Sequence, residues 1–210
     1  MVKKFTFIRQ KVKSYYSEKV LQFGATPAGV DWSSPESQQL RFKQLVKLCD
    51  GSTIFSINDW GCGYGAMYEY LTYQGFQFQY SGYDLSDSMI DRARSMIADK
   101  LNCEFTVGDS LKEADYTVAS GVFNVKLDIP VPDWEKYVLE TLDKMDRVSR
   151  KGFSFNILTR YADKEHMKDH LYYADPCFYF DYCKKKFSKH VALLHDYPLY
   201  EFSILVRKDI

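Results

Sequence analysis

The stretch that most constrains this chain is Asp-Trp-Gly-Cys-Gly-Tyr-Gly at residues 59–65. Residues 53–58 before it are rich in apolar side chains and predict a buried strand, while residues 66–73 after it predict a helix. Glycine has no Cβ, so a turn with three glycines can adopt positive φ angles and approach a ligand closely. Because a strand, such a turn and a helix present backbone N–H groups to polar ligands, we expect a ligand-binding loop here.

Strands and helices alternate along most of the remaining chain. Strands are predicted at residues 78–85, 103–107, 115–120, 152–158, 190–195 and 200–207, and helices at 35–49, 86–97, 132–148 and from Pro176 onward, with Asp175 as a cap. The alternation predicts an α/β fold with a doubly wound, mostly parallel seven-stranded sheet, Rossmann-like, with helices on both faces. The last two strands are joined by too few residues for a parallel crossover, so the last strand is expected to be antiparallel.

The length of 210 residues fits one main domain. Residues 35–210 are predicted to form this domain. Residues 1–34 are predicted to form an N-terminal helical segment, helical over 5–23, that serves as a lid.

Composition excludes several classes of protein. Basic and acidic residues are equal in number, 28 of each, which argues against an extended surface for nucleic-acid phosphates. The five cysteines have no CxxC spacing, so neither a zinc site nor a disulfide framework is predicted, and no metal is expected. The sequence has neither a long apolar run nor the features of a signal peptide. We expect a cytoplasmic monomer or homodimer without nucleic-acid or membrane partners.

Two acidic residues, Asp84 and Asp109, follow successive predicted strands. In an open parallel sheet, ligands bind outside the carboxyl ends of the strands, where both residues are expected to lie. An ionised carboxylate only accepts hydrogen bonds, and one such group can take both hydroxyls of a ribose. Asp84 also comes about 20 residues after Gly63, the spacing of the sugar-binding acid in dinucleotide folds. The strand ends therefore predict a ligand that contains a nucleoside.

Three segments taken together resemble a known family. Residues 59–65, the Tyr-Asp-Leu-Ser at 83–86 and the Gly-Asp-Ser at 108–110 look like motifs I, II and III of class I S-adenosylmethionine-dependent methyltransferases. The resemblance covers roughly residues 33–210, and the combination is more specific than any single motif. It implies S-adenosyl-L-methionine as cofactor, S-adenosyl-L-homocysteine as product, and methyl transfer to an oxygen or nitrogen of a small-molecule acceptor.

The resemblance also implies roles for individual residues. The glycines of residues 59–65 would pass under the methionine part of the cofactor, with Asp59 steadying the loop or binding the amino group. Asp84 would hold the ribose hydroxyls, Leu85 would pack on adenine, and Asp109 would accept from the adenine amino group. The turn at 120–121 would lie under the sulfonium. The predicted cofactor-binding residues are Asp59, Gly61, Cys62, Gly63, Gly65, Asp84, Leu85, Ser86, Met89, Gly108, Asp109, Ser110, Ser120, Gly121 and Phe123.

Candidate catalytic residues follow from the chemistry of methyl transfer, which needs a base only when the acceptor must lose a proton. His195 ends a predicted strand beside Asp196, and a neighbouring carboxylate raises the pKa of an imidazole and can orient it. We expect His195 as the base with Asp196 beside it, and Asn124 facing the substrate. The alternative is that His195 and Asp196 only satisfy a hairpin turn. The predicted substrate-binding residues, from the N-terminal segment and the loop after residue 158, are Tyr16, Trp32, Tyr172 and Tyr173.

Three alternatives stay open at this point. NAD(P) binding, as in an oxidoreductase, has the spacing G-x-G-x-x-G, whereas here Gly65 follows Tyr64 directly and Ala66 holds the next position. A methyltransferase acting on nucleic acid or protein would show a concentrated basic face next to Phe123 and His195. A cofactor-binding partner without activity would show an obstructed pocket.

Overall fold

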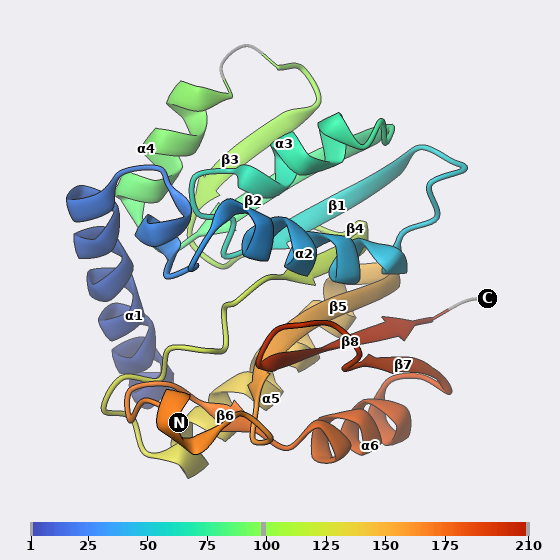
Figure 1. The fold of residues 1–210 in the computed structure, drawn as a ribbon. Helices are drawn as coiled ribbons and strands as arrows, with labels where there is room; N and C mark the ends of the chain where they lie inside the picture. Colours follow the sequence, from blue (N-terminus) through green and yellow to red (C-terminus); the bar gives the residue numbers. More distant parts are fainter. Residues whose placement is uncertain (1, 98–99, 209–210) are drawn as a thin grey trace.

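The computed structural model describes residues 2–97 and 100–208, which form one mixed sheet with helices around it (Figure 1). The strands lie in the order β3-β2-β1-β4-β5-β8-β7, and β6 pairs separately with β5. Strands β1 to β5 are parallel, whereas β8 runs antiparallel to both β5 and β7. The predicted Rossmann-like sheet with its antiparallel last strand is confirmed. The strands are β1 Phe55–Trp60, β2 Phe78–Asp84, β3 Cys103–Val107, β4 Ala114–Ala119, β5 Ser149–Thr159, β6 Tyr173–Ala174, β7 His190–Leu194 and β8 Glu201–Arg207.

The short strand β6 brings the strands of this sheet to eight, one more than predicted. It pairs parallel with the end of β5, where Leu158 lies opposite Tyr173. A strand of two residues has no alternation of polar and apolar side chains, so its pairing depends on the fold of the loop that carries it. The remaining differences from the predicted strands lie in their end residues.

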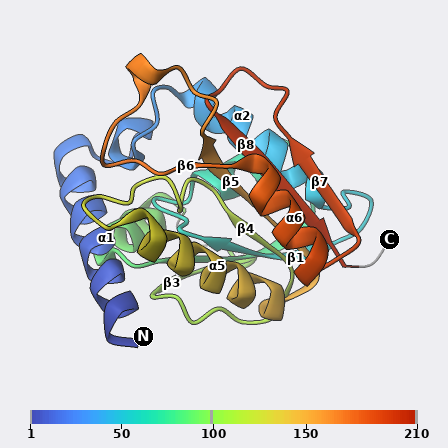
Figure 2. The same ribbon diagram turned by 90° about the horizontal axis from the view of Figure 1, so that it is seen from below.

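Helices cover both faces of the sheet (Figures 1 and 2). Helices α2 to α4 pack on one face through apolar residues such as Leu45, Leu71 and Ile90, and α5 and α6 pack on the other through residues such as Trp134 and Tyr179. These side chains are buried, and each face has its own apolar core. The helices are α1 Val2–Phe23, α2 Pro35–Leu45, α3 Ala66–Tyr73, α4 Asp87–Met96, α5 Val131–Val148 and α6 Pro176–Lys186, with 3-10 turns η1 Pro27–Val30, η2 Val46–Leu48 and η3 Lys164–His166.

Local sequence signals account for several helix starts. The Asp175 side chain accepts hydrogen bonds from the backbone N–H groups of Cys177 and Phe178, with Pro176 in the first turn of α6. Ser34 and Ser37 form a capping box at the start of α2. Both starts lie where the sequence predicts them.

Helix α1 lies along the edge of the sheet at which the parallel strands end (Figure 1). Its Ile8 is 1% exposed in the core shared with α5, and its Val20 is also buried. The Ser17 hydroxyl lies 2.8 Å from that of Ser86, and Lys11 pairs with Asp128 at 2.5 Å. The N-terminal segment is therefore packed directly on the ends of the strands. Within the described part of the chain, no helix combines the length and the apolarity needed to cross a membrane.

Candidate active site

A cavity of about 870 Å³, counting its part open to solvent, lies at the carboxyl ends of the strands, where the chain order reverses between β1 and β4. Its floor comes from the loop after β1, the end of β2 and the turn after β4, and its cover comes from α1, η1 and α2. Predicted site residues that line it are Asp59, Gly61, Cys62, Gly63, Asp84, Leu85, Met89, Ser120, Gly121, Tyr16 and Trp32.

The loop after β1 and the end of β2 hold each other in place. Gly63 has a φ of +54°, and its N–H donates to one carboxylate oxygen of Asp84 at 3.0 Å. The other oxygen accepts from the backbone N–H of Ser86 at 2.8 Å. The backbone N–H of Leu85 also donates to this carboxylate, which has about four acceptor positions, so at least one is left for a ligand. Burial raises the pKa of Asp84, although these backbone N–H groups favour its charged form.

The turn after β4 is shaped by its contact with Trp32. Gly121 has a φ of +74°, and a Cβ on it would lie 2.3 Å from the Trp32 ring, so only glycine fits there. Beside it, the hydroxyl oxygen of Ser120 is buried and has no hydrogen-bond partner in the structure. A buried hydroxyl without a partner is unfavourable, and a polar ligand atom in the adjoining cavity would satisfy it.

Asp59 is the most deeply buried acid of the cavity wall, with 2% of its surface exposed. It accepts a hydrogen bond from the Tyr80 hydroxyl at 2.6 Å. Burial raises the pKa of Asp59 from 3.8 to about 7; the nearby Asp84 adds to the rise and the Tyr80 hydrogen bond opposes it. The folded protein therefore keeps this proton over a pH range in which the unfolded chain has lost it.

This difference predicts a pH-dependent effect of Asp59→Asn. Because the folded-state pKa lies above the unfolded one, the stability that comes from the neutral carboxyl is lost as pH rises from about 4 to about 7. The asparagine variant does not titrate, so its advantage in free energy of unfolding over the wild type should grow by about 2 kcal/mol between pH 5 and pH 8. Urea unfolding at both pH values measures it, with exposed Asp91→Asn as control. An equal difference at the two pH values would contradict the assignment.

The remaining predicted residues do not line the cavity. Three of them have backbone or capping roles: Gly65 precedes α3 with a φ of +88°, Ser86 caps α4, and the Gly108 N–H donates to the Asp84 carbonyl at 2.7 Å. Asp109 pairs with Arg9 at 3.0 Å and Lys144 at 3.3 Å, and lies with Ser110 in a second, smaller hollow. The residues outside the main cavity are Gly65, Ser86, Gly108, Asp109, Ser110, Phe123, Asn124, Tyr172, Tyr173, His195 and Asp196.

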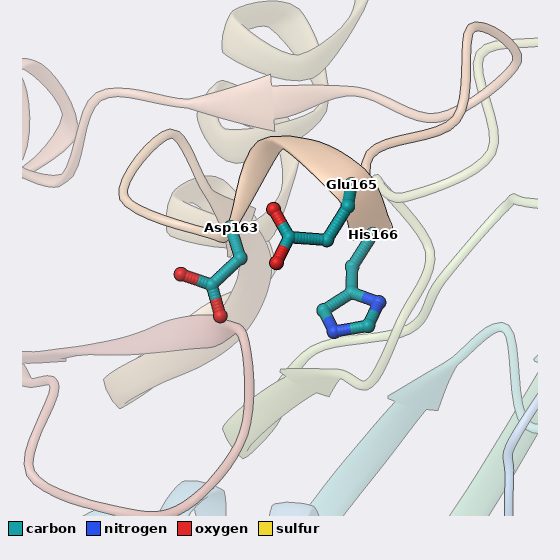
Figure 3. Close-up of side chains that lie close together, drawn as sticks. All are labelled: Asp163, Glu165 and His166. Carbon is teal, nitrogen blue, oxygen red and sulfur yellow. The ribbon is translucent and has the colours of Figure 1, made fainter.

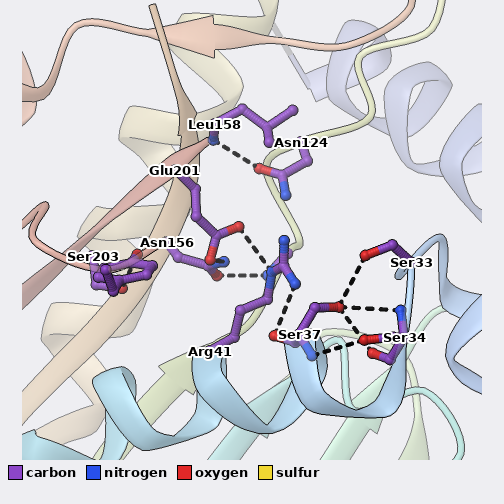
Figure 4. Close-up of polar contacts among 11 residues, drawn as sticks. Ser33, Ser34, Ser37, Arg41, Asn124, Asn156, Leu158, Glu201 and Ser203 are labelled. Carbon is purple, nitrogen blue, oxygen red and sulfur yellow. Dashed lines mark hydrogen bonds and ion pairs between the residues drawn. The ribbon is translucent and has the colours of Figure 1, made fainter. Parts of the chain in front are cut away.

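Phe123 and Asn124 lie inside the protein and away from the cavity lining. The fully buried Phe123 ring packs against Phe155, with ring centroids 5.8 Å apart. The Asn124 side-chain oxygen accepts from the Leu158 N–H at 3.2 Å, a contact visible in Figure 4. Asn124 thus ties the chain after β4 to the end of β5 through its side-chain oxygen.

The predicted base and substrate loop also lie outside the cavity lining. His195 and Asp196 are exposed and follow β7, the strand at the far end of the sheet, with the His195 ring 6.0 Å from that of Tyr161. Tyr172 is buried, its hydroxyl 3.0 Å from that of Tyr179, and Tyr173 accepts a backbone hydrogen bond. The structure thus places these residues away from the β1–β4 switch point, because the strand order puts β7 at the far end of the sheet.

One group of metal-ligand side chains occurs among the described residues: Asp163, Glu165 and His166 on the exposed turn η3 (Figure 3). Their ligand atoms lie within 4.8 Å of one another. Asp163 already accepts a hydrogen bond from the Tyr200 hydroxyl at 2.5 Å, and all three side chains are exposed. Clustered exposed carboxylates are not by themselves a metal site.

The structure adds residues that the sequence analysis does not predict. The cover and walls of the cavity include Val12, Lys13, Val30, Gln38, Phe42, Tyr64, Ala66, Val122 and Tyr137. Gln38 and Phe42 are four residues apart and therefore lie on the same side of α2. This spacing can indicate a buried side of a helix, but it does not indicate what that side packs against. Outside the cavity lining, Arg41, Asn156 and Glu201 form a buried polar network (Figure 4). Because Arg41 and Glu201 are far apart in the chain, no local pattern connects them.

Comparisons with known proteins agree with this geometry. A family model described as a methyltransferase domain matches residues 57–152. Rv1506c of Mycobacterium tuberculosis, whose given name is that of a methyltransferase, is 49% identical over 164 residues, which cover 78% of this chain and 99% of that protein.

Two solved structures show the same fold over nearly the whole chain. Magnesium protoporphyrin IX methyltransferase from Synechocystis PCC 6803 with bound SAH has a TM-score of 0.66 at 12% identity, covering 98% of this chain and 100% of that one. The DhpI-SAM-HEP complex has a TM-score of 0.65 at 15% identity, covering 94% and 97%. With the family model and the close relative, these findings show that the chain belongs to the class I S-adenosylmethionine-dependent methyltransferases.

Proposed function

We propose that this enzyme transfers a methyl group to an oxygen or nitrogen atom of a small molecule. The observation that carries the proposal is the cover of the cavity, which the chain supplies itself. Val12 and Tyr16 of α1, Val30 of η1 and Trp32 lie over the glycine loop. A large polymer would have to displace this cover, whereas a small acceptor fits beneath it. In this proposal residues 1–34 are the lid that the sequence predicts.

The residues of the cavity fit S-adenosylmethionine. Asp84 keeps acceptor capacity for a ligand, the glycine loop leaves no Cβ at Gly63, and the Ser120 hydroxyl lacks a partner. Leu85 and Met89 offer an apolar wall suited to adenine. When bound, S-adenosylmethionine supplies an activated methyl group. We assign Asp84, Gly63 and Ser120 to hold it. Asp109 is outside the lining of this cavity and is paired with Arg9 and Lys144.

On the acceptor side, we assign the aromatic cover residues to position the acceptor. Tyr16 and Trp32 line the cavity, and Tyr137 stands in its wall. Burial, reinforced by the negative charge of Asp31, raises the pKa of Tyr16 well above 10, so Tyr16 keeps its proton and can donate a hydrogen bond. Holding the acceptor atom in line with the methyl carbon is itself a large part of the acceleration in such a displacement.

The alternative acceptors are nucleic acid and protein. The predicted sign of either was a basic face next to Phe123 and His195. Instead, the charges in the segments around His195 are mixed: Asp163 and Glu165 flank Lys164 at η3, and Asp196 follows His195. The solved methyltransferase from Synechocystis is named for a small acceptor, magnesium protoporphyrin IX, which favours the same choice by analogy of fold.

We predict that His195→Ala leaves the rate of methyl transfer within about twofold of the wild type, since a base must reach the proton that it removes. The exposed His195 ring lies against Tyr161 and Phe202 and does not line the cavity. Initial rates with the first acceptor found measure the effect, with exposed His190→Ala as the matched control. A fall in kcat of about 100-fold for His195→Ala alone would restore it as the base.

The function as a whole is tested in two stages. Calorimetry of the purified protein against S-adenosylmethionine, S-adenosylhomocysteine and NADH should show binding of the first two and none of the third. Transfer of labelled methyl groups is then screened against phenols, amines, carboxylic acids, transfer RNA and total cell protein. Label only in RNA or protein would overturn the small-molecule proposal. Sedimentation of the same sample distinguishes a monomer from a homodimer, both of which the sequence allows.

A further inference from the structure

We propose that Arg41 is a positioning residue that holds the Trp32 ring against Gly121 and so fixes the acceptor-side wall of the cavity. The inference rests on the proposed small-molecule function, because it assigns Trp32 to the acceptor. Trp32 and Gly121 line the cavity, whereas Arg41, Asn156 and Glu201 are not among its lining residues. Figure 4 shows the contacts among the last three.

The Arg41 guanidinium contacts the Trp32 ring and is held in place by hydrogen bonds. Its central carbon lies 3.9 Å from the centroid of the Trp32 ring, in cation–π contact. Its Nε donates to Glu201 at 2.8 Å, and an Nη donates to the backbone carbonyl of Ser37 at 2.9 Å. The planar group is thus held by two hydrogen bonds while one face is offered to the indole, an arrangement that lysine cannot reproduce.

Glu201 and Asn156 connect Arg41 to the turn after β4. Glu201 is fully buried, and its second oxygen accepts from the Asn156 side-chain amide at 2.9 Å. The amide oxygen of Asn156 in turn accepts from the Gly121 N–H at 2.7 Å. Both oxygens of Glu201 and both ends of the Asn156 amide therefore have partners, which fixes the distance between Arg41 and Gly121.

The contact between Trp32 and Gly121 completes a closed path of contacts. Trp32 lies so close to Gly121 that a Cβ there would meet its ring at 2.3 Å. Indole, guanidinium, carboxylate, amide and backbone N–H thus form one closed path through the loop after η1 and through α2, β8, β5 and the turn after β4. Trp32 cannot leave Gly121 without losing the stacked guanidinium, so the lid segment and the floor of the cavity are coupled mechanically.

A buried ion pair is a poor source of stability, because desolvation offsets most of its attraction. Arg41 and Glu201 side chains are 8% and 0% exposed, so both have lost their water. We therefore assign the pair the role of holding the Trp32 ring through the Arg41 guanidinium, a contact that a neutral pair of similar shape would not make.

The test uses the double variant Arg41→Gln/Glu201→Gln, which leaves no unpaired buried charge and is expected to fold. Exposed Lys43→Gln on the same helix is the matched control. Acrylamide quenching of Trp32 fluorescence, obtained as the difference from Trp32→Phe, should rise by about twofold or more in the double variant while the melting temperature changes little. Arg41→Lys should show the same increase in Trp32 quenching, since lysine keeps the positive charge but lacks the planar guanidinium that stacks on the indole.

Binding of S-adenosylhomocysteine by calorimetry is measured on the same samples. We expect about tenfold weaker binding in the double variant, because the cover beside Gly121 is no longer held. Unchanged quenching and unchanged affinity in a folded double variant would overturn the positioning role. The quenching experiment needs no acceptor, so failure of the small-molecule screen with increased quenching would count against the proposed function alone.

Discussion

Replacing Asp84 with alanine is expected to weaken the binding of S-adenosylhomocysteine by about 100-fold or more, which corresponds to about 2.7 kcal/mol. The variant loses the acceptor capacity that the carboxylate keeps for a ligand. It also removes the two hydrogen bonds that hold the Gly63 and Ser86 backbone, so the glycine loop loses its anchor. Isothermal calorimetry with S-adenosylhomocysteine measures the loss directly, without knowledge of the acceptor.

Two further variants make this result specific. Asp84→Asn keeps one acceptor oxygen and should lie between alanine and the wild type. Asp91→Ala removes an exposed carboxyl from α4 and should bind like the wild type. Tight binding by a folded Asp84→Ala protein would show that the ribose assignment is wrong, whatever the acceptor is.

The second large effect concerns stability. Glu201→Ala leaves the Arg41 guanidinium buried without its counter-ion and the Asn156 amide without its acceptor. Removing one partner of a buried pair costs about 3–5 kcal/mol of the free energy of unfolding. For a chain of this size we expect the melting temperature to fall by about 10 °C.

Calorimetric melting measures this loss, and exposed Glu140→Ala on α5 is the matched control. The double variant Arg41→Gln/Glu201→Gln should recover most of the lost stability, since neither charge is left alone. If Glu201→Ala melted with the wild type, the pair would contribute nothing to the fold and Arg41 would have to be held by Ser37 and Trp32 alone.

The fold class, the order of strands along the chain and the glycine loop follow from local patterns. The glycine turn after β1 and the Asp175 cap of α6 depend on neighbours within a few residues. Asp84 is marked by its place at the end of β2 and by its spacing from Gly63. Turns and helix caps can be predicted without the tertiary structure, because their hydrogen bonds and backbone geometry involve residues that are close together in the chain. Trp32 and Tyr16, which the sequence assigns to the substrate, line the cavity, and their role there stays a prediction.

Only the strand ends near the switch point contribute residues to the cavity lining. His195 follows a strand that ends at the same edge of the sheet as β1, yet the order β5-β8-β7 moves it to the far end of that edge. Phe123 and Asn124 follow β4 directly, but their side chains turn toward the core and β5. Strand order and side-chain direction depend on crossovers and packing, which the local pattern does not contain.

The sequence by itself determined the α/β fold class, the glycine loop after β1 and the acid at the end of β2, because these depend on residues that are neighbours in the chain or follow successive strands. Only the tertiary structure decided what covers the cavity and what holds that cover. Arg41 and Glu201 come from opposite ends of the chain, and their contact exists because α2 packs across β5 and β8. A long-range contact of this kind leaves no periodicity in the sequence, since it depends on the three-dimensional path between the two residues.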